Sequence, residues 1–249
     1  MGFPIGIQLY SLKDETKDDF VGVLEKVAAI GYDGVEFAGY GGIEALEMKR
    51  HLKRLGLKAV SSHVPLEGLE SHLEEEIAYA KILGMTHMVC PWATFEGIED
   101  IEKLADTLNT VGEACYLEGI TLSYHNHDHE FIKIDGAYIL DLLFEKTNPQ
   151  YVKAQLDLCW VSRGGADEVA YVEKYKGRCP LLHAKDYVID PEFRQVEVGT
   201  GFVNFAGIEP IAKDAGVQWV IVEQEEYSMD PFESIQISLE NLKRLKVEK

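Results

Sequence analysis

The chain has 249 residues, of which 46% are hydrophobic and 27% are charged. These values are ordinary for a globular protein with a sizeable core, so we expect one folded domain over residues 1–249 and not a disordered chain. Its 43 acidic residues against 24 basic ones give a formal charge of -19. Because duplex nucleic acid and anionic membranes would be repelled over most of such a surface, we expect neither as a partner.

The first residues run from Met1 into an apolar strand pattern, without the basic segment and long apolar stretch of a secretion signal. No apolar run approaches membrane-spanning length, so we expect a cytoplasmic protein. Four widely separated cysteines include no Cys-x-x-Cys pair, which favours buried free thiols over a zinc knuckle or disulfide framework. They are Cys90, Cys115, Cys159 and Cys179.

Short β-rich segments alternate with helical patterns along the whole chain. The expected strands are Ile5–Leu9, Gly34–Phe37, Lys58–His63, His87–Cys90, Thr121–Asn126, Val152–Leu158, Leu181–Lys185 and Trp219–Glu223. The expected helices are Phe20–Ile30, Glu44–Leu55, Leu69–Leu83, Ile98–Glu118, Tyr138–Lys146, Glu168–Tyr175, Phe205–Ala215 and Phe232–Leu245. Eight strands at about 30-residue spacing in a chain of this length predict a single (β/α)8 TIM barrel, an α/β fold.

The longest region without a clear element is Val188–Val203, which would follow the seventh strand. Long loops at the carboxyl ends of barrel strands usually serve a ligand, so we interpret it as a lid or a contact for a sugar or phosphate. The alternative is a surface excursion.

Ionisable residues stand at the ends of several expected strands, where a charge is costly unless it binds something. They are Glu36, His63, His125, His127, Asp157, His183, Lys185 and Glu223. All would converge on one mouth of the barrel. A mixed set of carboxylates and imidazoles suits a divalent metal ion, with Mn²⁺ first and Mg²⁺, Co²⁺ or Zn²⁺ as alternatives.

Each candidate also has an ordinary structural explanation. His63 and Glu36 either line the pocket or form structural hydrogen bonds. Asp157 interrupts an apolar run and is either a metal ligand or a helix cap. For His183 and Glu223 the alternative to metal binding is an ion pair with each other or with neighbours.

The segment Tyr124–Phe131 contains the densest group of candidate ligands in the chain: His125, His127, His129 and Glu130. On an extended strand His125 and His127 would point to the same side, so one could bind the metal and the other the substrate. We expect His129 to be exposed to solvent.

Trp92, Trp160, Phe37 and Tyr10 lie at or just beyond strand ends. Their rings could stack on the apolar face of a sugar, and we assign Trp92 and Trp160 to the pocket, with core packing as the alternative.

The chain resembles the sugar phosphate isomerase/epimerase family with the xylose isomerase-like barrel, which includes ketose 3-epimerases, inosose dehydratases and keto-glycoside epimerases. The resemblance covers nearly the whole chain and depends on the order of several short motifs. These are Ile7-Gln8-Leu9-Tyr10-Ser11, Gly31-Tyr32-Asp33-Gly34-Val35-Glu36, Ser62-His63, His125-Asn126-His127, Leu156-Asp157, His183-Ala184-Lys185-Asp186, Val198-Gly199-Thr200-Gly201 and Val222-Glu223.

The resemblance implies a metal ion held by a glutamate on strand five, an aspartate on six, a histidine on seven and a glutamate on eight. Asp157, His183 and Glu223 match the last three. His125 stands where the strand-five glutamate is expected. Either His125 binds the ion or Glu130 folds back to replace the missing carboxylate.

For activity, the resemblance implies a metal-dependent isomerase or epimerase of a sugar, keto-sugar or cyclitol that proceeds through an enediolate. Glu223 is then the candidate base, His125 or Glu130 handles the second proton, and Lys185 binds a substrate oxygen or stabilises charge. Substrate contacts would come from Glu36, His63, Trp92, His127 and Trp160.

The nearest alternative activity is a dehydratase or lyase, which begins with the same proton abstraction. Apurinic endonucleases share this barrel, but the net charge and the limited number of candidate ligands argue against a multi-metal nuclease. A catalytically silent sugar-binding protein is the third possibility. The sequence leaves substrate, metal and homo-oligomerisation open.

Overall fold

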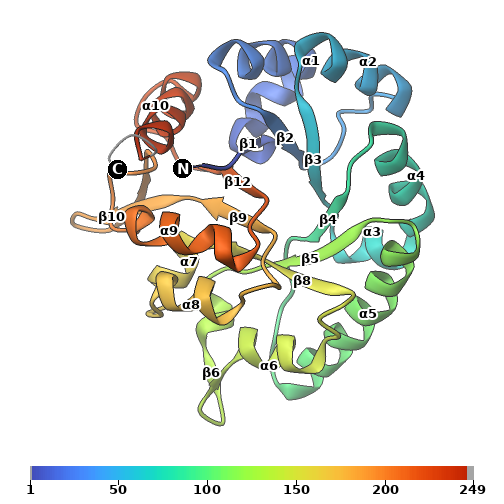
Figure 1. Ribbon diagram of the computed structural model, residues 1–249, viewed down its shortest axis with the longest axis vertical. Helices are drawn as coiled ribbons and strands as arrows, with labels where there is room; N and C mark the ends of the chain where they lie inside the picture. The colour runs from blue at the N-terminus through green and yellow to red at the C-terminus, as the bar shows by residue number, and fades with distance from the viewer. Residues whose placement is uncertain (1, 246–249) are drawn as a thin grey trace.

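A computed structural model describes residues 2–245. Eight parallel strands close into a barrel in the order β1-β12-β9-β8-β5-β4-β3-β2, with helices around it (Figure 1). Their bounds are β1 Ile5–Gln8, β2 Gly34–Phe37, β3 Lys58–His63, β4 His87–Cys90, β5 Thr121–His125, β8 Val152–Asp157, β9 Leu181–Ala184 and β12 Trp219–Val222. The predicted (β/α)8 barrel is confirmed, and each predicted strand agrees with its observed bounds to within one residue.

The helices are α1 Lys13–Ile30, α2 Ala45–Leu55, α3 Leu66–Ser71, α4 Leu73–Leu83, α5 Ile98–Leu117, α6 Ile139–Lys146, α7 Leu158–Arg163, α8 Glu168–Lys174, α9 Phe205–Ala215 and α10 Pro231–Arg244. Two short 3-10 helices, η1 Leu9–Leu12 and η2 His129–Phe131, follow β1 and β5. No helix within residues 2–245 is long and apolar enough to cross a membrane.

Helix α1 begins earlier than the sequence pattern indicates, but it is interrupted at Asp19, whose backbone is not helical. The Asp19 carboxylate accepts the Gly22 N–H at 2.8 Å, as a helix N-cap does. The predicted helix from Phe20 is therefore the second half of α1. It ends at Gly31, whose positive φ of 99° suits a residue without a side chain.

Two predictions about local structure are wrong, and a helix and a hairpin were not predicted. The region Val188–Val203 contains an antiparallel hairpin, in which β10 (Asp186–Ile189) pairs with β11 (Phe193–Val196). The predicted helix Leu69–Leu83 is divided at His72 into α3 and α4. Helix α7 and a second hairpin, β6 (Lys133–Ile134) with β7 (Ala137–Tyr138), were not predicted at all.

The core has two parts. Most buried apolar side chains lie in one cluster between the barrel and the helices. A separate cluster of Val60, Val89, Leu181 and Ile221 comes from four different barrel strands, with Trp219 packed against it. Because it is distinct from the cluster that contacts the helices, it forms a layer inside the barrel. This layer closes the interior below the polar residues at the carboxyl ends of the strands.

Candidate metal centre and active site at the carboxyl ends of the strands

Four buried side chains from neighbouring positions in the barrel converge at the ends of their strands. His125 ends β5, Asp157 ends β8, His183 lies in β9, and Glu223 follows β12. Each offers one ligand atom, and these atoms all lie within 4.8 Å of one another. The group brings together the four residues that the sequence nominates as metal ligands. Parallel register places Asp157 beside His183 directly.

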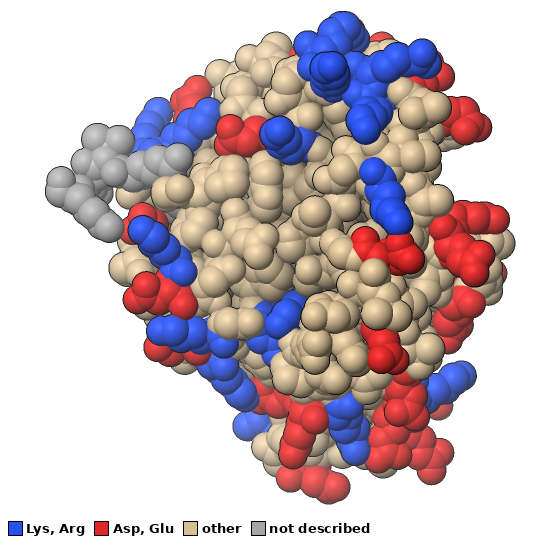
Figure 2. All heavy atoms as spheres, turned by 45° about the vertical axis from the view of Figure 1, so that its right-hand side comes forward, with Lys and Arg blue, Asp and Glu red and all other residues tan. Residues whose placement is uncertain are grey.

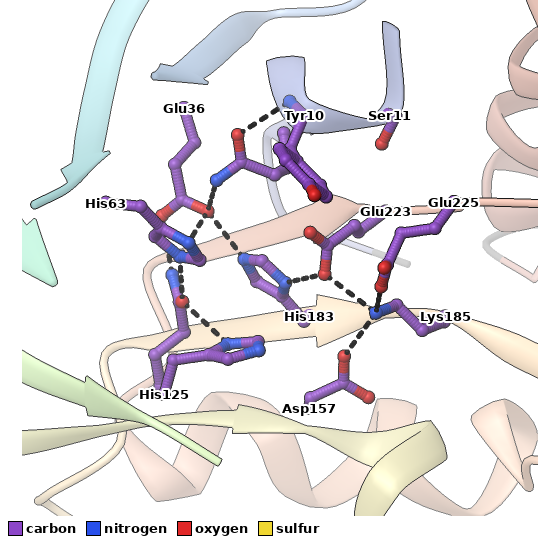
Figure 3. Close-up of polar contacts among 12 residues, drawn as sticks. Tyr10, Ser11, Glu36, His63, His125, Asp157, His183, Lys185, Glu223 and Glu225 are labelled. Carbon is purple, nitrogen blue, oxygen red and sulfur yellow. Dashed lines mark hydrogen bonds and ion pairs between the residues drawn. The ribbon is translucent and has the colours of Figure 1, made fainter. Parts of the chain in front are cut away.

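His183 lies between two carboxylates (Figure 3). Its Nε2 is 2.6 Å from Glu36 Oε1 and its Nδ1 is 3.0 Å from Glu223 Oε2. Burial opposes a charge on His183, but Glu36 and Glu223 outweigh it and raise its pKa to about 10. The ion pair weighed from sequence therefore forms. Because Glu36 holds Nε2, Nδ1 is the nitrogen that faces the four-residue group.

Glu36 is fully buried and its carboxylate is surrounded by donors. Its Oε1 accepts from Gln8 at 2.8 Å, and its Oε2 accepts from Ser61 at 2.5 Å and Gln155 at 2.6 Å, in addition to the contact with His183. His63 Nε2 lies 3.1 Å from Oε1. Burial alone would raise its pKa, but the two histidines outweigh it and hold the pKa well below the usual value. Glu36 is therefore an ionised anchor for the ring of His183.

His125 has one ring nitrogen fixed and one left for a ligand. Its Nδ1 is 3.0 Å from Gln155 Oε1, which also lies 2.7 Å from His63 Nε2. An amide oxygen only accepts hydrogen bonds, so Nδ1 carries the proton and Nε2 carries a lone pair. Burial and the nearby charge of His183 lower the pKa of His125 well below its usual value. Neutral imidazole is the form that binds metals.

Lys185 is buried among three carboxylates. Its Nζ is 2.6 Å from Glu225 Oε1, 3.0 Å from Glu223 Oε2 and 3.5 Å from Asp157 Oδ2. Burial opposes the charge, but these carboxylates outweigh it and raise the pKa of Lys185 well above its usual value. The same ammonium lies 4.9 Å from the centre of the Trp160 ring. Lys185 therefore presents a permanent positive charge beside the four-residue group.

Asp157 combines both of the roles considered from sequence. Its Oδ1 accepts the Trp160 N–H at 3.0 Å and so caps helix α7. Its Oδ2 is buried and has no hydrogen-bond partner among residues 2–245. Burial raises the pKa of Asp157 to about 6 despite the opposing effect of Lys185. This buried oxygen has only the ion pair with Lys185 at 3.5 Å, and its position beside a free imidazole nitrogen and Glu223 fits a divalent cation.

Aromatic side chains stand beside the group. Trp160 is 9% exposed and stacks on Phe193 of β11 with ring centroids 5.6 Å apart, so the hairpin contributes to this wall. The Trp160 Nε1 donor is buried and unpartnered in the described part of the chain. Trp92 is 48% exposed and meets the His127 ring edge-on at 4.5 Å. Both tryptophans thus lie close to residues of the site.

Glu130 lies apart from the four-residue group. Its carboxylate accepts the Tyr124 hydroxyl at 2.7 Å and the His127 backbone N–H at 2.8 Å. The structure therefore places His125, and not Glu130, beside Asp157 and the other candidate ligands. His129, expected to be exposed, is partly buried and its Nε2 lies 2.9 Å from the Ala93 carbonyl oxygen.

Sequence reasoning missed three residues that support the site. Gln8 and Gln155 hold Glu36, and Glu225 makes the shortest contact to Lys185. Both glutamines could have been found in the way that Asp157 was found, because each is a polar residue within a buried apolar strand. Glu225 lies beyond β12 in a polar stretch, and nothing in its neighbours distinguishes it from a solvated carboxylate.

The fold and the site define a closed (β/α)8 barrel with ionisable side chains gathered at the carboxyl ends of its strands, the usual active-site face of that fold. Residues 24–245 match the family described as xylose isomerase-like TIM barrel, and the chain belongs to that family. It is thus a barrel of the sugar isomerase/epimerase type. The four cysteines are free and buried, as predicted.

Three comparisons place the chain more closely. An inosose dehydratase from Geobacillus kaustophilus is 25% identical over 247 residues, which cover 82% of this chain and 79% of the relative. A sugar phosphate isomerase/epimerase from Parabacteroides distasonis has a TM-score of 0.86 at 26% identity, covering 98% of this chain and 96% of the other. The IOLI protein with a binding zinc atom has a TM-score of 0.77 at 15% identity, with 98% of each chain covered, and shows the fold alone.

Proposed function

We propose that the chain is a divalent-metal-dependent isomerase or epimerase that removes a proton next to the carbonyl of a sugar, keto-sugar or cyclitol. The observation that carries this proposal is the buried group of His125, Asp157, His183 and Glu223, in which one Asp157 oxygen forms no hydrogen bond within residues 2–245. The family match and the sugar phosphate isomerase/epimerase of similar structure support the same reaction class.

The ion would be held by His125, Asp157, His183 and Glu223, and it would replace the proton on the Nδ1 of His183. Two imidazoles and two carboxylates suit Mn²⁺, Co²⁺ or Zn²⁺, and Mg²⁺ less well, because the donor set mixes oxygen with borderline nitrogen. The IOLI protein, which shares the fold, has a bound zinc atom, and this supports metal binding by a barrel of this kind. When bound, a divalent ion would polarise the substrate carbonyl and stabilise negative charge on its oxygens.

The protein's own side chains would move the proton and balance the charge. Glu223 is held ionised by Lys185 and His183, which outweigh the effect of its burial and lower its pKa well below the usual value. We assign it the removal of the proton next to the carbonyl. The Glu223 carboxylic acid formed in this way would return the proton to the substrate, because the Nε2 of His125 carries a lone pair for the ion and its Nδ1 donates to Gln155. The Lys185 ammonium would donate a hydrogen bond to the oxygen on which charge develops.

The remaining candidates divide into supports and walls. Glu36 and His63 are bonded to Gln8, Ser61, Gln155 and His183, so we assign them the positioning of the ligand rings. Trp160 offers a ring face and an unpartnered N–H. Together with Trp92 and His127 it would contact the substrate.

A dehydratase acting on a keto-sugar or inosose is the second candidate. The observation that favours it is that the matched sequence relatives, including the one from Geobacillus kaustophilus, are named inosose dehydratases. The first proton abstraction would be the same, and the two activities differ in whether a hydroxyl one carbon further from the carbonyl leaves.

Nuclear magnetic resonance in D₂O tests both candidates. Metal-loaded protein would be incubated with a panel of ketoses and inososes, and the substrate would be followed for deuterium incorporation and product. Isomerisation or epimerisation gives a deuterated product that keeps all the carbon and oxygen atoms of the substrate. Dehydration gives an unsaturated product that has lost water. Glu223→Gln should abolish exchange, while Glu173→Gln, an exposed carboxylate on α8, should not. Absence of exchange with every substrate in metal-loaded wild type would refute the proposal.

A further inference from the structure

A second group of candidate ligands lies beside the first. His127, His129 and Glu130 each offer one ligand atom, and these atoms lie within 4.8 Å of one another. None of the three belongs to the four-residue group already described. The His125 and His127 rings, one from each group, have centroids 4.9 Å apart, so the two groups are neighbours at the same barrel mouth.

The tautomer of His129 is fixed by its surroundings. Its Nε2 is 2.9 Å from the Ala93 carbonyl oxygen, and a carbonyl can only accept, so Nε2 carries a proton. Metal-binding histidines usually donate their second N–H to a carbonyl or carboxylate in this way. The other nitrogen, Nδ1, is buried, has no hydrogen-bond partner within residues 2–245 and lies 3.3 Å from Glu130 Oε2.

Glu130 contributes a fixed and fully buried carboxylate. Tyr124 and the backbone N–H of His127 donate to its two oxygens, so these contacts hold its position. Because Nδ1 of His129 carries a lone pair, it and an unprotonated Glu130 carboxylate 3.3 Å away would be two hydrogen-bond acceptors that repel each other. His127 adds another buried nitrogen without a partner in the described chain, its Nδ1. Two buried imidazole nitrogens without hydrogen-bond partners in the described chain, beside a fixed carboxylate, form a place for a cation.

We propose that His127, His129 and Glu130 bind a second divalent transition-metal ion. Two imidazoles and one carboxylate form a three-ligand set that leaves coordination positions open, as in catalytic zinc sites and in other sites with two histidines and one carboxylate. The nitrogen donors favour Zn²⁺, Co²⁺ or Ni²⁺ over Mg²⁺. His127 is partly exposed, so a solute oxygen can reach the open side.

This inference does not depend on the reaction assigned to the first site. It predicts a binding stoichiometry, and the ligands of the two sites are different residues. Calorimetric titration and equilibrium dialysis of metal-stripped full-length protein with Co²⁺, repeated with Zn²⁺, measure the number of ions per chain. The visible absorption of bound Co²⁺ gives an independent signal of its coordination.

Wild type should bind two ions per chain. His129→Ala and Glu130→Gln should each weaken one of them by at least about 100-fold, because removal of a direct ligand costs no less than removal of a supporting residue. His183→Ala should remove the other ion. His72→Ala, at an exposed histidine with 61% of its side chain accessible, is the control and should leave both.

The variants separate failure of one site from failure of the other. If wild type binds one ion, and His183→Ala loses it while His129→Ala keeps it, the second site would be overturned. A proton between His129 and Glu130 would then take the place of the second ion. Two ions that both survive His129→Ala and Glu130→Gln would overturn its location. One ion lost in His129→Ala and retained in His183→Ala would support the second site and refute the first. Because His129 is only partly buried, its variant tests the site even if Glu130→Gln does not fold.

Discussion

Replacing Glu36 by glutamine should destabilise the metal-stripped protein by about 3–5 kcal/mol, the usual cost of removing one partner of a buried ion pair. The glutamine keeps the shape but has one oxygen where the carboxylate has two. If its amide nitrogen takes the place of Oε2, it faces Gln155 Nε2, which lies 2.6 Å away and can only donate. If it takes the place of Oε1, it faces Gln8 and His183. Either orientation leaves a buried donor without a partner and removes the charge beside His183.

Urea denaturation followed by circular dichroism, in the presence of a chelator, measures this change. For a protein of this size, a decrease of about 3–5 kcal/mol in the free energy of unfolding also corresponds to a melting temperature lower by roughly 6–20 °C. Glu25→Gln is the matched control, because Glu25 pairs with Arg54 at 2.7 Å but half of its side chain is exposed. That variant should cost less than about 1 kcal/mol. Equal effects of the two substitutions would refute the role given to Glu36.

The difference between wild type and Glu36→Gln should also depend on pH. The pKa of Glu36 is held well below its usual value in the folded protein, whereas in the unfolded chain it is about 4.3. Its contribution to stability is therefore fully present above the unfolded value and is lost as the pH falls below it. The gap between the two proteins should narrow below about pH 4.5. It should also narrow as the pH rises above about 6.5, the unfolded pKa of histidine, because Glu36 helps to raise the pKa of His183 to about 10 and that contribution to stability is lost at higher pH.

Three further outcomes are expected. In calorimetry with Mn²⁺, His183→Ala should lose at least about 100-fold in affinity at the first site, and a similar loss in His125→Ala would identify His125 as its fourth ligand. In the deuterium-exchange assay, Lys185→Met should lower kcat by about 10²–10³-fold with the fold intact by circular dichroism, and an unchanged kcat would exclude its contact with the developing charge. The four buried cysteines, whose pKa values burial raises, should react with a disulfide reagent at pH 8 only after unfolding.

The barrel strands could be predicted closely because strands buried on both faces are short apolar runs ended by a polar or turn residue. Val152–Asp157 shows both the strength and the limit of this signal. Its end at Asp157 was predicted within one residue, but the following apolar residues belong to α7, Leu158–Arg163. The six residues of α7, four of them apolar, are too few for their periodicity to separate strand from helix.

The β10–β11 hairpin could not be predicted because each of its strands has only four residues. Its second strand reads Phe-Arg-Gln-Val, and its first begins at Asp186, whose carboxylate accepts the backbone N–H groups of Gly199, Gly201 and Val203. Those contacts join residues 13 to 17 positions apart and leave no local pattern. The loop after Asp186 is thus fixed by one buried carboxylate, which composition does not reveal.

The sequence predicts the net charge of the protein but not how the charged side chains are distributed over its surface. In Figure 2, lysine and arginine side chains gather at the top of the view and acidic side chains at the right and the bottom, while the centre is largely uncharged. The formal charge of -19 therefore describes an average. Inside the barrel mouth the balance is different, because Lys185 and His183 lie among Glu36, Asp157, Glu223 and Glu225.

The presence of His125 at the end of β5 changes both the charge and the donor set of the candidate metal centre. A carboxylate there would give three anionic ligands, whereas neutral His125 leaves two, Asp157 and Glu223, and Lys185 lies within 3.5 Å of both. A hard ion such as Mg²⁺ depends on anionic oxygen ligands and loses most from this exchange. An ion that binds imidazole well loses least, since His125 and His183 then provide half of the donors. The strand-five histidine would therefore favour Zn²⁺, Co²⁺ or Mn²⁺ at the first site.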